Sequence, residues 1–336
     1  EKMLEDNLRL AREFLDASIL LDRPKYRETA KQTFDYLLEQ LYDPAVPGFR
    51  GSQGAHSDYF SLSPDQRTAD ARPESDPSCY ASNNGLAVTV LLDAAWKLGD
   101  LSLQTKALQT LETLDSAARS GSFSHVYSEQ GSSDVPAFFT DWAWLLTALV
   151  QAHGNTAGEG YLERAVAVAQ IMVDGFFDQK AGGFFDIEDQ PDGIGHLQIK
   201  EKVLADNTVA AQALIRLHQT TRNADYRQIA EATLSAFVET FREQGEFAAD
   251  YGLTVHLLNN DLVEVTVEGK PEDAGCQALL AAAVRLPQPN LDIKTIVAVD
   301  GDSVARAHVC LDTVCLPPVD APAELSEAVA GLTKQQ

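Results

Sequence analysis

Residues 206–234, D-N-T-V-A-A-Q-A-L-I-R-L-H-Q-T-T-R-N-A-D-Y-R-Q-I-A-E-A-T-L, decide the fold. The part 209–217 is apolar on nearly every side, which is typical of a helix buried all round. The second part places Tyr226, Ala230 and Leu234 four residues apart with charged residues between them, which is typical of a helix with one solvent-exposed face. A buried helix followed by an amphipathic one predicts a helical hairpin.

The same pattern occurs three more times along the chain, as an internal repeat. The amphipathic helices of these copies carry Tyr26 with Ala30, Leu103 with Ala107, and Tyr161 with Ala165. In the first hairpin described, the pair Asp206-Asn207 stands 20 and 19 residues before Tyr226. At the same offsets before Tyr26, Leu103 and Tyr161 stand the pairs Asp6-Asn7, Asn83-Asn84 and Asp141-Trp142. The sequence therefore predicts four helical hairpins.

Inner apolar helices enclosed by outer amphipathic helices indicate an α/α toroid. The inner helices begin at Asn7, Asn84, Trp142 and Asn207, which are 77, 58 and 65 residues apart. These intervals are too irregular for an open solenoid, whose repeats keep a tight period. We expect a mainly α protein with a six-hairpin-like toroid, which four hairpins leave incomplete.

The sequence pattern changes after residue 258. The expected elements are a strand at 262–267, a helix at 272–286, a strand at 296–299, a third strand at 305–311 and a helix at 321–332. The first three form a βαβ unit with parallel strands. We therefore expect the toroid over 1–258 and a small α/β lobe over 259–336.

Composition excludes several classes of partner. The 336 residues include 50 Asp and Glu against 26 Lys and Arg, a formal net charge of −24. Such a chain is repelled by polyanions, so we expect no nucleic acid and no membrane as partner. No stretch reaches the roughly 18 apolar residues of a membrane helix, and the N-terminus has no signal-peptide pattern.

The four cysteines are too sparse for a disulfide scaffold, which predicts a cytoplasmic protein. Cys310 and Cys315 do not form a CxxC motif, and we expect both to be free thiols. No metal site is expected, and Gly269 is not part of a GxGxxG motif, so no cofactor is expected either. Because the chain begins at Glu1 without an initiator Met, we expect it to be part of a longer protein.

Five motifs resemble those of one family, the bacterial YyaL-type proteins and their animal spermatogenesis-associated, thioredoxin-like relatives. In chain order they are Glu1-Lys2-Met3-Leu4-x-Asp6-Asn7, Asn84-Gly85-Leu86, Asp141-Trp142-Ala143, Gly182-Gly183-Phe184-Phe185 and Val309-Cys310-x4-Cys315-Leu316-Pro317-Pro318. They resemble the family's E-K-M-L-Y-D-N, N-G-L, D-Y-A, G-G-F-[FY] and V-C-x4-C-L-P-P boxes, and they keep the family's order.

This resemblance implies a barrel of the six-hairpin glycosidase and N-acylglucosamine 2-epimerase kind. In the family the barrel follows an N-terminal thioredoxin-like domain, which is not visible in this sequence and is therefore an expected partner upstream. Two positions depart from the family: Asn83 replaces a Trp, and Ser78 replaces a Lys, with Asp76 as the remaining acid nearby. A pocket built on those residues would be altered.

The inner helices of a toroid begin at one mouth, so their first residues are candidates for chemistry. Hydrolysis or epimerisation of a sugar needs a proton donor and a proton acceptor around the reacting carbon. We predict Asp141, Asp206 and His125 as catalytic, with His196 as a second histidine in a connecting segment. The predicted substrate-binding residues are the aromatic Trp142, Trp144 and Tyr80, together with Asn84, Asn207 and Asp76. Helix capping by Asp and Asn is the competing explanation.

The leading hypothesis is a carbohydrate-processing domain, either a glycoside hydrolase or a sugar epimerase. The alternative is a non-catalytic module that binds a ligand or partner for the thioredoxin-like domain, so catalysis itself is left open. An incomplete toroid exposes apolar surface on its inner helices, and we expect an upstream segment or a second copy, as a homo-oligomer, to cover it.

Overall fold

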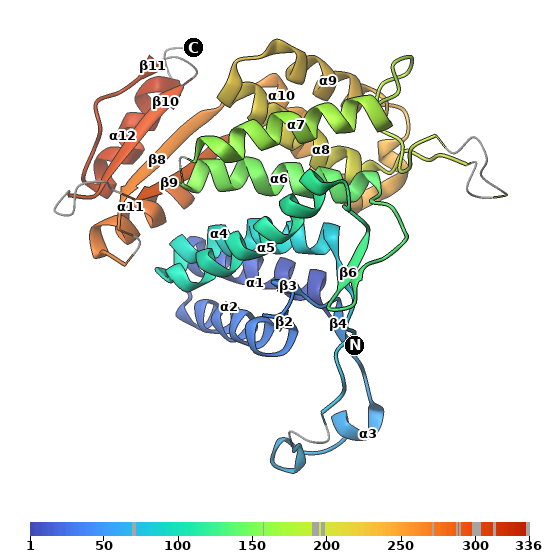
Figure 1. The fold of residues 1–336 in the computed structure, drawn as a ribbon. Coiled ribbons are helices and arrows are strands. Elements are labelled where there is room, and N and C mark those ends of the chain that lie inside the picture. The colour runs from blue at the N-terminus through green and yellow to red at the C-terminus, as the bar shows by residue number, and fades with distance from the viewer. Residues whose placement is uncertain are drawn as a thin grey trace. The chain divides into compact units, whose positions relative to one another are not determined.

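The computed structural model describes residues 1–68, 72–156, 158–189, 195, 199–270, 272–286, 288, 290–297, 304–311 and 314–333. Most of these residues lie in helices (Figure 1). The chain divides into two compact units, which are Glu1–Ala94 with Ser102–Ala137, and Ala95–Leu101 with Phe138–Gln336.

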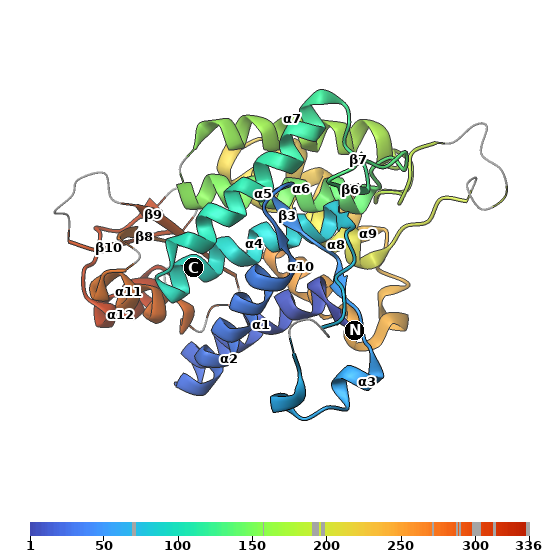
Figure 2. The same ribbon diagram turned by 60° about the horizontal axis from the view of Figure 1, so that its bottom comes forward.

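The first unit contains two of the predicted hairpins. Its helical segments are α1 (Leu4–Leu20), α2 (Pro24–Tyr36), a π-helical turn (Leu37–Leu41), α3 (Ser57–Phe60), a 3-10 turn (Pro64–Gln66), α4 (Ala81–Leu98) and α5 (Leu101–Ser120), of which α4 and α5 cross the boundary between the units. The hairpin helices α1 and α2 lie side by side (Figure 2). Leu8 and Leu15 of α1 and Ala30 and Phe34 of α2 are buried, and Ala30 is the residue that follows Tyr26 in the repeat pattern.

Short antiparallel strands fix the chain just before α1 and α4. They are β1 (Lys2–Met3) with β4 (Ser52–Gln53), β2 (Tyr42–Asp43) with β3 (Gly48–Phe49), and the sheet of β5 (Cys79–Tyr80), β6 (Val126–Ser128) and β7 (Gly131–Ser132). Since β1 leads into α1 and β5 leads into α4, the starts of both inner helices are held by hydrogen-bonded backbone.

The second unit contains the other two hairpins. Its toroid helices are α6 (Phe139–Thr156), α7 (Glu159–Phe176), α8 (Leu204–Thr221), α9 (Ala224–Ser235), a 3-10 segment (Phe241–Ala248) and α10 (Ala249–Asn259). The inner helices α6 and α8 contact each other, and each contacts its own outer helix. Ala165 and Ala230 of the Tyr-x3-Ala pattern are fully buried in the outer helices. The predicted hairpins are thus α1–α2, α4–α5, α6–α7 and α8–α9.

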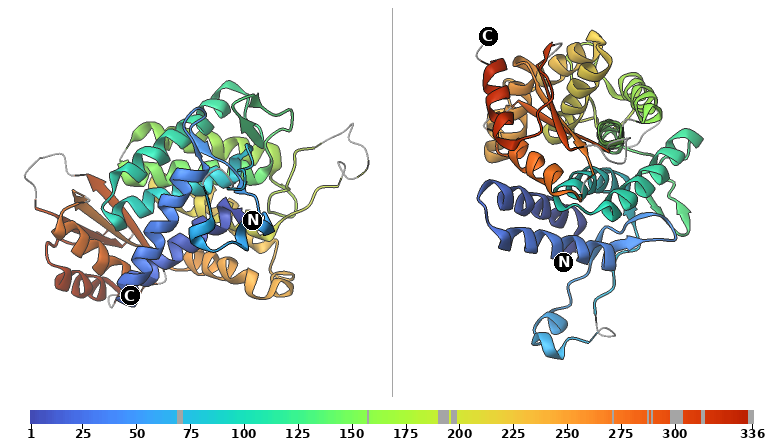
Figure 3. Two further views of the ribbon diagram at one scale, coloured as in Figure 1. Left: turned by 90° about the horizontal axis from the view of Figure 1, so that it is seen from below. Right: turned by 90° about the vertical axis from the view of Figure 1, so that its left-hand side faces the viewer.

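The C-terminal lobe belongs to the second unit. It consists of β8 (Val263–Gly269), α11 (Ala274–Val284), β9 (Leu291–Val297), β10 (Arg306–Leu311), β11 (Val314–Cys315) and α12 (Pro322–Thr333), with sheet order β11-β10-β8-β9. Strands β8 and β9 are parallel, which confirms the βαβ unit, and β10 is antiparallel to β8. Helices α11 and α12 pack against strands of this sheet (Figure 3).

Two details of the lobe differ from the prediction. Strand β9 begins at Leu291, five residues before the predicted start at residue 296. The prediction missed these first residues because the polar Asp292 and Lys294 interrupt the apolar pattern of the strand. The expectation of free thiols at Cys310 and Cys315 is wrong, since the two residues face each other in the register of β10 and β11 and form a disulfide. Among the described helices, none is both long and apolar enough to cross a membrane.

Candidate functional site

Asn207 lies in the first turn of α8 and is almost fully buried. Its Oδ1 accepts a hydrogen bond from the backbone N–H of Phe184 at 2.7 Å, and its Nδ2 donates to the carbonyl of the same residue at 3.0 Å. Nδ2 also donates to the carbonyl of Val203, four residues earlier, at 2.9 Å. The carboxamide therefore fastens the segment after α7 to the start of α8, and we call this arrangement an asparagine clamp.

Asn84 forms the same clamp in the first turn of α4. Its Oδ1 accepts from the N–H of Phe49 at 2.6 Å, and its Nδ2 donates to the carbonyls of Phe49 and Tyr80, both at 2.9 Å. The side chain is fully buried. Because the backbone uses both carboxamides, the predicted role of Asn84 and Asn207 in binding substrate has no support in this geometry.

Asp141 lies in the first turn of α6, where it is fully buried. Its Oδ2 accepts a hydrogen bond from the backbone N–H of Phe138, three residues earlier, at 2.8 Å. This is the bond by which a carboxylate satisfies a free N–H group at the start of a helix. A substrate cannot reach Asp141 in this conformation, and its catalytic role stays a prediction.

Asp206 is the more accessible of the two predicted catalytic carboxylates. It is half-buried in the first turn of α8, and its Oδ1 accepts a hydrogen bond from the hydroxyl of Thr140 at 3.0 Å. Thr140 stands at the start of α6, so this bond joins the starts of two adjacent inner helices. Thr140 could not be identified from the sequence, because its pairing with Asp206 follows from the packing of α6 on α8.

The two predicted tryptophans do not form one surface. Trp142 and Trp144 are both half-buried in α6. Residues two apart on a helix project in different directions, so the two indole rings cannot stack on the same face of a sugar. Trp142, which follows Asp141 directly, is the one that lies at the helix start.

In the first unit, Tyr80 and His125 come together. Strand β5 pairs with β6, and the two rings lie with centroids 5.5 Å apart at an interplanar angle of 60°. The Tyr80 ring packs so closely on Gly51 that a Cβ at that position would lie 2.7 Å from the ring. Asp76 accepts a hydrogen bond from the N–H of Ser78 at 3.0 Å, which shapes the turn before β5. The other predicted histidine, His196, lies outside the described residues.

A cluster that the sequence did not indicate precedes α8. The ammonium groups of Lys200 and Lys202 lie 4.1 and 4.8 Å from the ring centroid of Phe185, which follows the clamped Phe184. Lys202 also donates to Asp178 Oδ2 at 2.8 Å, and this bond is the main reason that the pKa of Asp178 falls to about 2. The cluster ties the segment before α8 to the segment after α7.

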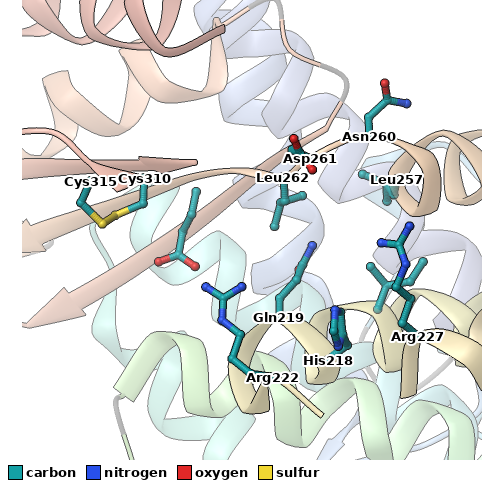
Figure 4. Close-up of a pocket in the computed structure, with 12 residues that line it drawn as sticks. His218, Gln219, Arg222, Arg227, Leu257, Asn260, Asp261, Leu262, Cys310 and Cys315 are labelled. Atoms are coloured by element: carbon teal, nitrogen blue, oxygen red, sulfur yellow. A yellow bond between two sulfur atoms is a disulfide. The ribbon is translucent and has the colours of Figure 1, made fainter. Parts of the chain in front are cut away.

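A cavity of about 270 Å³ lies between the end of α8 and the lobe within the second unit (Figure 4). His218, Arg222 and Arg227 line it on one side, and the disulfide of Cys310 and Cys315 lines it on another. The cavity could not be predicted from the sequence, because its walls come from separate elements. Among the described residues, no group of three or more His, Cys, Asp or Glu side chains is placed to hold a metal ion.

Comparison with known proteins gives relatives of low identity, and no family model matches the chain. Mouse spermatogenesis-associated protein 20 is 25% identical over 178 residues, covering 52% of this chain and 22% of that protein. The human protein of the same name is 23% identical over 211 residues, covering 56% of this chain and 26% of that protein. The chain therefore spans only about a quarter of the length of these relatives.

Solved structures share the fold. D-mannose isomerase matches with a TM-score of 0.55 at 13% identity, covering 70% of this chain and 58% of that one. Cellobiose 2-epimerase from Bacillus thermoamylovorans matches with a TM-score of 0.57 at 11% identity, covering 71% of this chain and 61% of that one. A family 76 glycoside hydrolase (mannosidase) from Bacteroides thetaiotaomicron matches with a TM-score of 0.53 at 12% identity, covering 72% and 62%.

Identity this low shows the fold alone. The relatives confirm the resemblance that the five motifs carry, and the solved structures confirm the predicted fold class. The chain has the α/α-toroid fold of sugar epimerases and six-hairpin glycosidases, and its curated homologues include the spermatogenesis-associated 20 proteins.

Proposed function

We propose that this chain is a carbohydrate-processing domain, of the sugar epimerase or glycoside hydrolase class, in which Asp206 is the carboxylate that acts on the sugar. The observation that carries the proposal is the half-buried Asp206, held by Thr140 at the adjoining starts of α6 and α8. The shared fold of an isomerase, an epimerase and a mannosidase supports a sugar as the ligand.

A carboxylate that moves a proton on a sugar must be fixed in orientation and still be reachable. Asp206 meets both conditions, because the hydroxyl of Thr140 holds one oxygen while the residue as a whole is only half-buried. Asp141 then acts indirectly, by fixing the start of α6 and with it the neighbouring Thr140. Trp142 supplies an apolar face for the sugar ring in this proposal.

The first unit offers a second pair of groups for the same chemistry. A neutral imidazole is a base near neutral pH, and a phenol ring stacks on a sugar face. Tyr80 and His125 pack against each other and carry these two groups. They are the proposed base and aromatic surface of an epimerase reaction, with Asp76 in the same loop as a proposed polar contact.

The test is turnover of a panel that includes D-mannose, cellobiose and α-mannan oligosaccharides by the wild-type chain and by Asp206→Asn. We expect Asp206→Asn to lower kcat/KM about 100-fold or more, which is the typical effect of removing a general acid or base. Asp225→Asn is the matched control, since Asp225 is an exposed acid in the first turn of the outer helix α9. Equal activity of Asp206→Asn and wild type would contradict the proposed role.

The second candidate function is a binding module without catalysis, which serves a thioredoxin-like domain. One observation favours it: the fold itself uses Asp141, Asn84 and Asn207, three of the residues predicted to act on substrate. If none of the sugars is turned over or bound, this second function is the better account of the chain.

A further inference from the structure

The repeat of hairpins contains a third clamp asparagine. Asn7 occupies the first turn of α1, at the position that Asn84 and Asn207 occupy in α4 and α8. Its Nδ2 donates to the carbonyl of Met3, four residues earlier, at 2.6 Å. This is the same local bond that the other two asparagines make with Tyr80 and Val203.

The rest of the Asn7 clamp is open. In the part of the chain that the structure describes, the bond to Met3 is the one hydrogen bond of the Asn7 side chain, and Oδ1 accepts none. Met3 lies four residues before Asn7, at the end of β1, and Leu10 lies three residues after Asn7 in α1; they are 39% and 56% exposed. Asn7 thus presents a donor and an acceptor between two exposed apolar side chains.

The two occupied clamps, at Asn84 and Asn207, show which kind of backbone segment would fit the open clamp at Asn7. Each holds the N–H and the C=O of a single Phe, and a Gly precedes that Phe in both. A Cβ on Gly48 would lie 3.2 Å from Asn84 Oδ1 and 2.6 Å from the hydroxyl of Tyr127, so a larger residue would not fit there. Gly183 has a φ of +76°, a backbone conformation that glycine adopts without strain.

The occupant of the Asn7 clamp is not a folded second copy of this chain. The three Gly-Phe pairs of the sequence are at residues 48–49, 175–176 and 183–184. Their Phe side chains are 0%, 2% and 0% exposed, and two of the pairs already fill clamps. The remaining Gly-aromatic pair, Gly160-Tyr161, lies inside helix α7, where the backbone is helical and not extended. The occupant must therefore be a different polypeptide segment, one that carries a Gly-aromatic pair outside a helix and outside an occupied clamp.

We infer that Asn7, Met3 and Leu10 form a docking site for an extended Gly-aromatic peptide segment, of the kind that follows an outer helix in this fold. Asn7 Oδ1 accepts a hydrogen bond from the N–H of the aromatic residue and Nδ2 donates one to its C=O, as in the clamps of Asn84 and Asn207. The apolar side chains of Met3 and Leu10 cover its ring. This inference is independent of the proposed sugar chemistry.

The test uses the whole chain and a fluorescein-labelled peptide with the sequence of residues 181–187, Ala-Gly-Gly-Phe-Phe-Asp-Ile. Fluorescence anisotropy measures its binding to the wild type, to Asn7→Ala and to Asn259→Ala. Asn259 is an exposed asparagine whose Nδ2 donates to the carbonyl four residues earlier at 2.7 Å, so it is the matched control. A second peptide carries an N-methyl group on the backbone nitrogen of the first Phe, which removes the N–H group that would donate a hydrogen bond to Asn7 Oδ1.

We expect Asn7→Ala and the N-methylated peptide each to weaken binding about tenfold or more, since each removes hydrogen bonds at the clamp. Asn259→Ala leaves the affinity unchanged. In ¹⁵N NMR spectra the side-chain amide signals of Asn7 shift on addition of the unmodified peptide, and circular dichroism shows whether Asn7→Ala keeps its helix content.

Three results would overturn the inference. The first is the absence of peptide binding to a folded wild-type chain at millimolar peptide. The second is equal binding of the methylated and unmethylated peptides. The third is concentration-dependent self-association of the wild type that Asn7→Ala abolishes, which would assign this face to a second copy.

Discussion

The buried carboxamide of Asn207 satisfies one backbone N–H and two carbonyl groups. Asn207→Ala would leave the Phe184 groups buried without partners. Each such group costs about 1–3 kcal/mol, so we expect the free energy of unfolding to fall by about 2–4 kcal/mol in urea titrations. The exposed Asn259, with one local bond, is the control, and Asn259→Ala should change stability by less than about 0.5 kcal/mol. Equal losses in the two variants would contradict the structural role of the clamp.

The carboxylate of Asp178 makes the free energy of unfolding of the chain depend on pH. Hydrogen bonds from Lys202 and from the N–H groups of Lys180 and Ala181 lower its pKa to about 2, from 3.8. Because the pKa is lower in the folded state than in the unfolded state, its stabilising contribution is complete above about pH 5 and is lost as the pH falls toward about 2.

Urea titrations of wild type and Asp178→Asn at several pH values test this contribution. The difference between their free energies of unfolding should be largest near neutral pH and should shrink below about pH 5. Asp174→Asn, which removes an exposed carboxylate from the same region of the chain, controls for the change in net charge. A difference that stays constant down to about pH 2 would show that the Lys202 bond does not hold Asp178 ionised.

At the scale of elements, the turns between inner and outer helices place a residue in the left-handed backbone conformation. Gly99 after α4 has φ +70°, whereas Asp22 after α1 has φ +51°. This conformation raises the free energy of a residue that has a Cβ by about 1–2 kcal/mol, whereas glycine adopts it without that cost. We therefore expect Asp22→Gly to stabilise the chain and Gly99→Ala to destabilise it, each by about 1 kcal/mol. Denaturant midpoints measure both, and a shift of the same sign in the two variants would contradict this explanation.

The sequence predicted elements best where a local pattern determined them. Tyr226 and Ala230 marked an outer helix, and the run of alternating valines at 263–267 marked a buried strand. Elements defined by pairing were not predictable in the same way. The disulfide depends on β11 folding back on β10, and the spacing of Cys310 and Cys315 carries no signal for that antiparallel register.

For the whole molecule, the fold class was predicted from the repeated hairpins and from the resemblance to the family motifs, and the structure and its solved neighbours confirm that fold class. The candidate site could be predicted only in part. Asp and Asn at helix starts cap helices and clamp loops as readily as they bind ligands, so the sequence could not separate Asp206 from the buried Asp141 and Asn207. Burial and the bond from Thr140, which only the packing of α6 on α8 creates, make that distinction.

The most direct test of the central claim is a thermal-shift titration of the wild type and Asp206→Asn with the sugar panel, because a ligand that binds only the folded state raises the apparent Tm. We expect at least one sugar to raise the Tm of the wild type and of Asp225→Asn and to have a much smaller effect on Asp206→Asn. An unchanged Tm with every sugar, or an equal rise in all three proteins, would contradict a sugar site at Asp206.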